Sequence, residues 1–196
     1  MAVVVLAVLA LAGCGGDKKA AEPPCPIHGK QVKFPLLDES KAHTVGVLTN
    51  LGRFSFRLDV ADSPCTTASF AALVRSRFFD GTEFHRIVPG FVIQGGDPTG
   101  TGRGGPGYSV RDVPPGSSLY MEGVVAMAKS AAEPPGTSGS QFFVVTAVNA
   151  GLRPEYAILG KVTSGLPIVE KIGRLGNPAN DKPTRRVAVL RMVVSP

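Results

Sequence analysis

Apolar and polar side chains alternate over residues 53–58, which predicts a strand with one buried face. The apolar positions are Phe54, Phe56 and Leu58. Another apolar run, Thr44–Leu48, lies just before this segment, and Asn50-Leu51-Gly52 separates the two. Because glycine favours a tight turn between antiparallel strands, we predict a β-hairpin here.

Apolar residues after the hairpin recur at helical spacing. Ser63-Pro64 is typical of a helix N-cap followed by proline at the first helical position. We predict a helix from there to about Arg77, with an apolar stripe formed by Phe70, Leu73 and Val74. Another helix is predicted over Leu166–Ile172.

Short apolar runs dominate the rest of the chain, separated by segments rich in the 24 glycines and 17 prolines. The stretch from Gly95 to Gly123 is too rich in both to be regular throughout. We predict strands at Val92-Ile93, Val124–Met127, Phe142–Val145, Ala157–Val162 and Val187–Val194. Short strands, two helices and no βαβ alternation predict a mainly β fold, a closed antiparallel barrel with helical caps.

The N-terminus has a different pattern. Residues 2–12 are apolar without a break, too few for a membrane-spanning helix of about 20 residues but typical of the core of a secretion signal. Leu11-Ala12-Gly13-Cys14 resembles the lipobox of bacterial lipoproteins, in which the cysteine is lipidated. The alternatives are an ordinary signal peptide and a buried strand. No Lys or Arg precedes the apolar run, which departs from the usual signal pattern.

The lipoprotein resemblance implies three regions and a location. Residues 1–14 would be the signal sequence with the lipobox, 15–40 an extended proline-containing tether, and 41–196 the folded domain. A lipid on Cys14 would anchor the protein to the extracytoplasmic face of the cell membrane. Cys25 and Cys65 would then lie in an oxidising space, where a disulfide between them can persist. The sequence does not show that these two cysteines are close enough to bond.

The formal net charge of +6 is spread along the 196 residues, without a run of five or six basic side chains. We interpret it as a solvated basic surface, with weak attraction to anionic lipid as the next alternative. Nucleic-acid binding is disfavoured because no basic-aromatic motif accompanies the charge. The three histidines do not have zinc-site spacing, so we expect no metal. The Gly-x-Gly-x-x-Gly at 100–105 is followed by Pro106-Gly107 instead of a helix, so we expect no dinucleotide cofactor.

The segment Phe84–Asp97 places Arg86 among aromatic residues, and the segment Gly139–Phe143 adds a glutamine and two phenylalanines. Together they offer a cation, an apolar surface and amide donors. This combination suits holding a peptide and stabilising a polarised, uncharged state better than it suits breaking bonds. We therefore interpret His85 as a structural neighbour and not as a general base.

These segments resemble the cyclophilins, the cyclosporin-binding family of peptidyl-prolyl isomerases. Phe84–Asp97 matches the family signature, and Ser138–Phe143 matches another family block. Phe70, Gly104-Gly105 and Leu159–Val162 match further blocks in order, so that the resemblance covers about 44–194. It implies an eight-stranded closed antiparallel barrel with a helix over each end.

The resemblance also implies the chemistry, which is rotation about X-Pro peptide bonds over a barrier of roughly 18–20 kcal/mol. Arg86 would be the catalytic residue, donating to the prolyl nitrogen as it becomes pyramidal. Gln94 would orient Arg86 and the substrate carbonyl, Lys129 replaces a frequent asparagine, and Val92 replaces a frequent methionine. The implied substrate-binding residues are Phe91, Val92, Gln94, Ala128, Lys129, Gln141, Phe143, Leu152 and Tyr156.

Two positions depart from many family members. Gly151 stands where a tryptophan is linked to cyclosporin sensitivity, so we predict weak cyclosporin binding with isomerase activity retained. Tyr156 replaces a pocket histidine. The implied partners are proline-containing peptides and unfolded or exported proteins, whose folding the enzyme would accelerate. The alternative is a non-catalytic peptide-binding chaperone module on the same fold.

Overall fold

The structure is a computed structural model and describes residues 25–196. The predicted signal sequence, Cys14 and the first part of the predicted tether lie outside these residues. Among the helices of residues 25–196, none has the length and apolar character needed to cross a bilayer.

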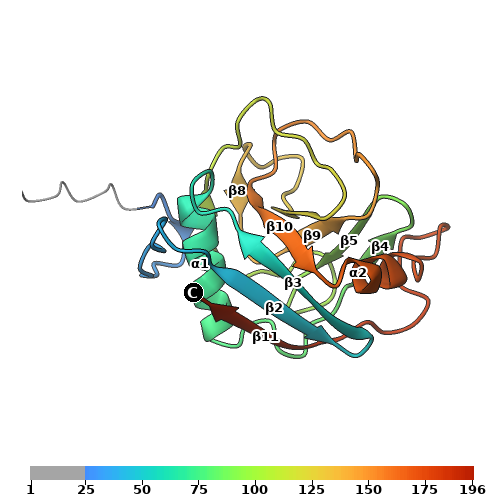
Figure 1. Cartoon of the computed structure of the whole chain (residues 1–196). Helices are drawn as coiled ribbons and strands as arrows, with labels where there is room; N and C mark the ends of the chain where they lie inside the picture. The colour runs from blue at the N-terminus through green and yellow to red at the C-terminus, as the bar shows by residue number, and fades with distance from the viewer. Residues whose placement is uncertain (1–24) are drawn as a thin grey trace, which may run out of the picture.

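Eight strands form one antiparallel sheet that curls around the main core (Figure 1). In spatial order they are β11 (Val189–Ser195), β2 (Thr44–Thr49), β3 (Gly52–Leu58), β10 (Ile158–Ser164), β7 (Val124–Met127), β9 (Phe142–Val145), β5 (Val92–Gly95) and β4 (Arg86–Val88). The predicted hairpin is β2–β3, in which Thr49 pairs with Gly52. The sequence therefore located seven of these strands to within one or two residues, whereas β4 was not predicted.

The prediction of a closed barrel is wrong, because β11 and β4 are the two edges of the sheet. Between these edges Glu83 forms an isolated bridge with Ala188, and the Phe84 N–H donates to the Val187 carbonyl at 3.0 Å. β4 has only three residues, which is too short to continue this contact into a ladder. The sheet is therefore an open, curled half-barrel.

Three short strands form a second sheet, in the order β1 (His28–Gly29), β6 (Tyr108–Arg111) and β8 (Thr137–Ser138). The sequence did not predict these strands. Two-residue strands leave no alternation to detect, and β6 lies inside the Gly- and Pro-rich stretch.

The two helices lie at opposite ends of the curled sheet (Figure 1). Helix α1 (Pro64–Arg75) begins at proline as predicted, and α2 spans Leu166–Gly173. The side chain of Ser63 does not cap α1, contrary to our expectation. The Asp112 carboxylate, which follows β6 directly, accepts a 2.6 Å hydrogen bond from the Thr66 N–H instead. The first turn of α1 is thus satisfied from a distant part of the chain.

Strand β9 divides the apolar side chains between two clusters. Phe142 points into the main core, where its ring meets those of Phe70, Phe79 and Phe84 edge-on at centroid distances of 5.6, 6.1 and 5.9 Å. Phe143 points to the opposite face and packs in a smaller cluster with Val92 and Tyr120, among others. Because successive side chains of a strand alternate, one strand builds both the core and the surface on which the candidate site lies.

Residues 25–40, the described part of the predicted extended tether, contact the domain. A disulfide joins Cys25 to Cys65 in α1. The Lys30 N–H donates to the Gly107 carbonyl at 2.9 Å, and the Phe34 ring stacks on Tyr108 with centroids 6.4 Å apart. The disulfide therefore adds a covalent link to a segment whose other contacts with the domain are short strand pairing and a few side-chain contacts.

Reducing this disulfide should release the segment locally and leave the main fold intact. We expect faster backbone hydrogen exchange over residues 26–37 in dithiothreitol, because few apolar contacts remain to hold them. Exchange in β2 and β3 should not change. The double variant Cys25→Ser/Cys65→Ser should show the same fast exchange with or without reductant. Loss of protection in β2 on reduction would contradict a local role.

Candidate active site

Arg86 lies in β4 at the open edge of the sheet, opposite Gln94 of β5 in the strand register. Its Nη1 donates to Gln94 Oε1 at 3.3 Å, and its Nη2 contacts Asp181 Oδ2 at 3.2 Å. The Arg86 side chain remains 40% exposed. A guanidinium has five N–H donors, so two acceptors fix its orientation and leave further donors available.

A small cavity of about 140 Å³ opens beside this guanidinium. The structure places nine of the ten predicted catalytic and substrate-binding residues around it, which are Arg86, Phe91, Val92, Gln94, Ala128, Lys129, Phe143, Leu152 and Tyr156. Gln141, the tenth, accepts a 3.0 Å hydrogen bond from Gln94 Nε2 and lines the neighbouring groove. The cavity therefore combines apolar walls with the Arg86 guanidinium.

Tyr120, which sequence reasoning missed, holds the wall of this cavity. Its hydroxyl donates to the Tyr156 carbonyl at 2.7 Å and accepts from the Tyr156 N–H at 3.0 Å. Burial raises the pKa of Tyr120 to about 12, so its hydroxyl stays protonated and able to donate. The Tyr156 ring meets Phe143 edge-on at 5.5 Å. A lone tyrosine in an irregular stretch gave no sequence signal of this role.

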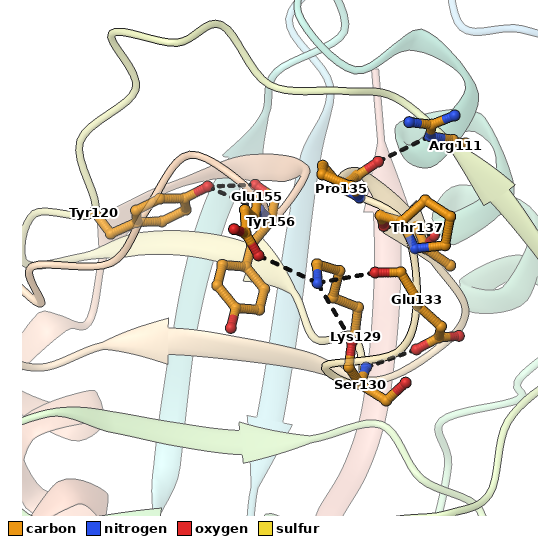
Figure 2. A network of polar contacts seen from close by, with 10 residues as sticks. Arg111, Tyr120, Lys129, Ser130, Glu133, Pro135, Thr137, Glu155 and Tyr156 are labelled. Carbon is orange, nitrogen blue, oxygen red and sulfur yellow. Dashed lines mark hydrogen bonds and ion pairs between the residues drawn. The ribbon is translucent and has the colours of Figure 1, made fainter.

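The Lys129 ammonium joins two loops (Figure 2). Its ammonium lies 3.4 Å from Glu155 Oε2 and donates to the carbonyls of Ser130 and Glu133 at 3.3 and 3.1 Å. It also lies 5.5 Å from the centroid of the Tyr156 ring. Only 3% of the side chain is exposed. The lysine that replaces a frequent asparagine is therefore satisfied by protein groups.

A larger groove of about 630 Å³ adjoins the cavity. Gln94, Ala128 and Lys129 line both hollows, so the two lie side by side. The Ala128 N–H already donates to the Gln141 carbonyl at 2.9 Å, which leaves the Ala128 carbonyl for any bound chain. The opposite wall of the groove is the glycine-rich segment 102–109.

Asp97 shapes this glycine-rich wall. The Thr99 N–H and hydroxyl donate to Asp97 Oδ1 at 2.7 and 2.8 Å, and the N–H groups of Gly102 and Gly104 donate to Oδ2 at 2.6 and 3.1 Å. Burial alone would raise the pKa of Asp97, but these hydrogen bonds together lower it to about 2. The carboxylate thus organises the loop as an anion.

The stability of the protein should therefore fall in acid because of Asp97. A depressed pKa contributes stability that is complete above the ordinary value near 4 and is lost as the pH falls through 2. The shift corresponds to about 2 kcal/mol. Urea unfolding at pH 4 and at pH 2 should show this loss in the wild type and in Asp62→Asn, which alters an exposed carboxylate. If Asp97→Asn loses as much unfolding free energy between pH 4 and pH 2 as the wild type does, the loss does not come from Asp97.

His85 lies beside this loop, and burial lowers its pKa below the usual value. Within residues 25–196 neither of its ring nitrogens has a hydrogen-bond partner. Gly151 directly precedes Leu152, which lines the cavity. Its φ of 62° is left-handed, and a Cβ built on it would meet open space.

Comparison with known proteins decides the family. The model of the family described as "Cyclophilin type peptidyl-prolyl cis-trans isomerase/CLD" matches residues 44–194. The chain is a cyclophilin-type peptidyl-prolyl cis-trans isomerase. This match covers all eight strands of the main sheet except the last residue of β11.

Individual cyclophilins agree with this assignment. The peptidyl-prolyl cis-trans isomerase-like 1 of Gibberella zeae is 37% identical over 73% of this chain and 89% of its own length. The mouse protein of the same name is 38% identical over 73% and 87%. A crystal structure of a Cryptosporidium parvum cyclophilin-type isomerase is 31% identical, with a TM-score of 0.71, and covers 80% of this chain and 99% of that one. The Cryptosporidium protein has also been crystallised in the presence of the dipeptide Ala-Pro.

These relatives overturn the predicted location. They are isomerase-like 1 proteins of a fungus and a mammal, and neither is named as a lipoprotein. The prediction of a lipid-anchored protein at the cell membrane, made from a short N-terminal motif, is therefore wrong. The cyclophilin signature segments, by contrast, correctly indicated the family.

Proposed function

We propose that the cavity binds the ring of a substrate proline and that Arg86 catalyses rotation of the preceding peptide bond. The observation that supports this most strongly is the guanidinium at the rim of an apolar cavity. Rotation is slow because the prolyl nitrogen shares its lone pair with the carbonyl. A fixed N–H donor that reaches this nitrogen once the bond twists stabilises the twisted state more than the planar ones.

The groove would hold the residues next to the proline. A run of hydrogen bonds crosses from the cavity to the groove wall. Arg86 donates to Gln94, Gln94 Nε2 donates to Gln141 at 3.0 Å, and Gln141 Nε2 donates to the Gly104 carbonyl at 2.9 Å. All three bonds run in the same direction, so each polarises the next. The crystallisation of the Cryptosporidium relative in the presence of Ala-Pro makes this dipeptide a suitable test ligand.

The test of this proposal is cis/trans exchange in a short Ala-Pro peptide, measured by NMR exchange spectroscopy with wild type and Arg86→Ala. We expect rapid exchange with the wild type and much slower exchange with the variant. Equal exchange rates for the two proteins would remove Arg86 from the mechanism.

Cyclosporin should inhibit this cyclophilin weakly. Gly151 supplies no side chain where many family members have tryptophan, and its left-handed φ of 62° disfavours any L side chain. We expect the exchange rate to persist at cyclosporin concentrations that stop a tryptophan-containing cyclophilin. The two enzymes should be assayed in parallel. If cyclosporin inhibits this enzyme as potently as it inhibits the tryptophan-containing one, the expectation is wrong.

We propose exported proteins as the clients of the enzyme. The Cys25–Cys65 disulfide supports this, because such bonds persist in oxidising spaces and are rare in the cytosol. Mass measurement of thiol-blocked protein from its native cells tests the support. If Cys25 and Cys65 are both free there, the disulfide gives no reason to assign exported clients.

A further inference from the structure

We propose that Asp181 is a positioning residue for isomerisation, which holds the Arg86 guanidinium in its productive orientation. This inference rests on the proposed catalytic role of Arg86. Asp181 lies 95 positions further along the chain, in the loop between α2 and β11, and its Oδ2 is 3.2 Å from Arg86 Nη2.

The backbone of this loop is fastened to the strand that carries Arg86. The Asp181 carbonyl accepts a 2.7 Å hydrogen bond from the N–H of Ile87, the residue after Arg86, and the Asp181 N–H donates to the Asn177 carbonyl at 2.8 Å. At Gly176 a Cβ would collide with the Ile87 carbonyl. The loop and β4 therefore form one unit, and the carboxylate cannot drift away from the guanidinium.

Asp181 adopts a left-handed backbone with φ of 58°. Glycine would meet this conformation with the least strain. Strained conformations that persist in a rigid setting concentrate at functional sites. Here the left-handed residue places its carboxylate directly on the proposed catalytic group.

The contact contributes orientation more than stability. The Arg86 and Asp181 side chains are 40% and 38% exposed, and ion pairs this exposed add little to folding stability. However, Nη1 contacts Gln94 of strand β5 and Nη2 contacts Asp181 of the loop after α2. These two acceptors together fix the plane of the guanidinium. Removing one acceptor lets the plane rotate, and small misplacements of a catalytic group lower rates strongly.

The experiment measures kcat and peptide affinity together, by NMR exchange with the Ala-Pro peptide. We expect Asp181→Gly to lower kcat about tenfold, to leave the peptide Kd unchanged, and to unfold at the same or a higher temperature, because glycine relaxes the left-handed backbone. Asp181→Asn should recover most of kcat, because its amide oxygen still accepts and asparagine tolerates this conformation.

Two controls separate this role from other effects. Glu170 lies in α2, and its half-exposed carboxylate pairs with Arg174 just after the helix. The variant Glu170→Gln removes this carboxylate and should keep the wild-type kcat. In the Arg86→Ala background, Asp181→Gly should cause no additional loss, because Asp181 acts through Arg86.

The outcomes distinguish the two proposals. Wild-type kcat in Asp181→Gly, or an equal loss in the Arg86→Ala background, would overturn the role of Asp181 and leave Arg86 as the catalytic residue. Wild-type kcat in Arg86→Ala would overturn both.

Discussion

Replacing Arg86 by alanine is expected to lower kcat/KM about a hundredfold, the usual loss when one preorganised donor to a transition state is removed. The apolar cavity and the groove would remain, so peptide affinity should fall much less than kcat. Arg86→Lys should also be slow, because an ammonium is a point charge and cannot contact Gln94 and Asp181 as a planar fork does. The measurement is cis/trans exchange at several peptide concentrations, which separates kcat from KM.

Arg191→Ala is the matched control for this experiment. Arg191 of β11 is also about half exposed, and its guanidinium lies 3.8 Å from the Asp80 carboxylate. It is not among the residues that line the cavity. It should keep the wild-type kcat/KM. Similar losses in Arg86→Ala and Arg191→Ala would point to a general effect of charge and against a specific donor.

Replacing Phe143 by alanine should weaken both stability and activity. The ring is 5% exposed and packs against Tyr156 and Tyr120 at centroid distances of 5.5 and 6.3 Å. Phe-to-Ala changes in such surroundings cost about 3–5 kcal/mol of unfolding free energy. The same change removes a wall of the cavity, so the KM for a proline peptide should rise. Urea unfolding gives the first quantity, and exchange kinetics corrected for the folded fraction give the second.

Phe142→Ala provides the comparison, because Phe142 is the adjacent residue of β9 and points into the main core. It is fully buried among other aromatic rings, and we expect a similar loss of stability. The folded fraction should keep the wild-type KM. An unchanged KM in Phe143→Ala, or a raised KM in both variants, would contradict the assignment of Phe143 to the substrate site.

The sequence located most of the main sheet and most of the cavity for a physical reason. Burial of one face imposes a period of two on strands and of 3.6 on helices, and the hairpin 44–58 and helix α1 follow these periods. The cavity residues were found through family segments. Of these, Phe84–Asp97 contains β4 and β5, and Ser138–Phe143 runs from the end of β8 to the start of β9. Sequence patterns therefore predict the structure correctly where the residues that contact one another are also close in the sequence.

Other features depend on contacts that leave no local pattern. A short edge strand such as β4 has the same composition whether or not it pairs with β11, so the sequence suggested a closed barrel. The N-cap at Ser63 was predicted from a motif, but the carboxylate that binds the helix N-terminus comes from Asp112, which is 46 residues from Thr66. Lys129 was expected among the substrate-binding residues, and no local pattern indicated that its ammonium joins two loops.

By itself the sequence determined the succession along the chain of the two helices and of every main-sheet strand except β4, the cyclophilin family, and the presence of Arg86 beside an apolar surface. Only the tertiary structure decided that the sheet stays open, that Tyr120 and Lys129 brace Tyr156, and that Asp181 meets the guanidinium. The reason is that periodicity records which face of an element is buried, not which distant element covers it. Hydrogen bonds between residues tens of positions apart depend on the folded backbone that brings them together.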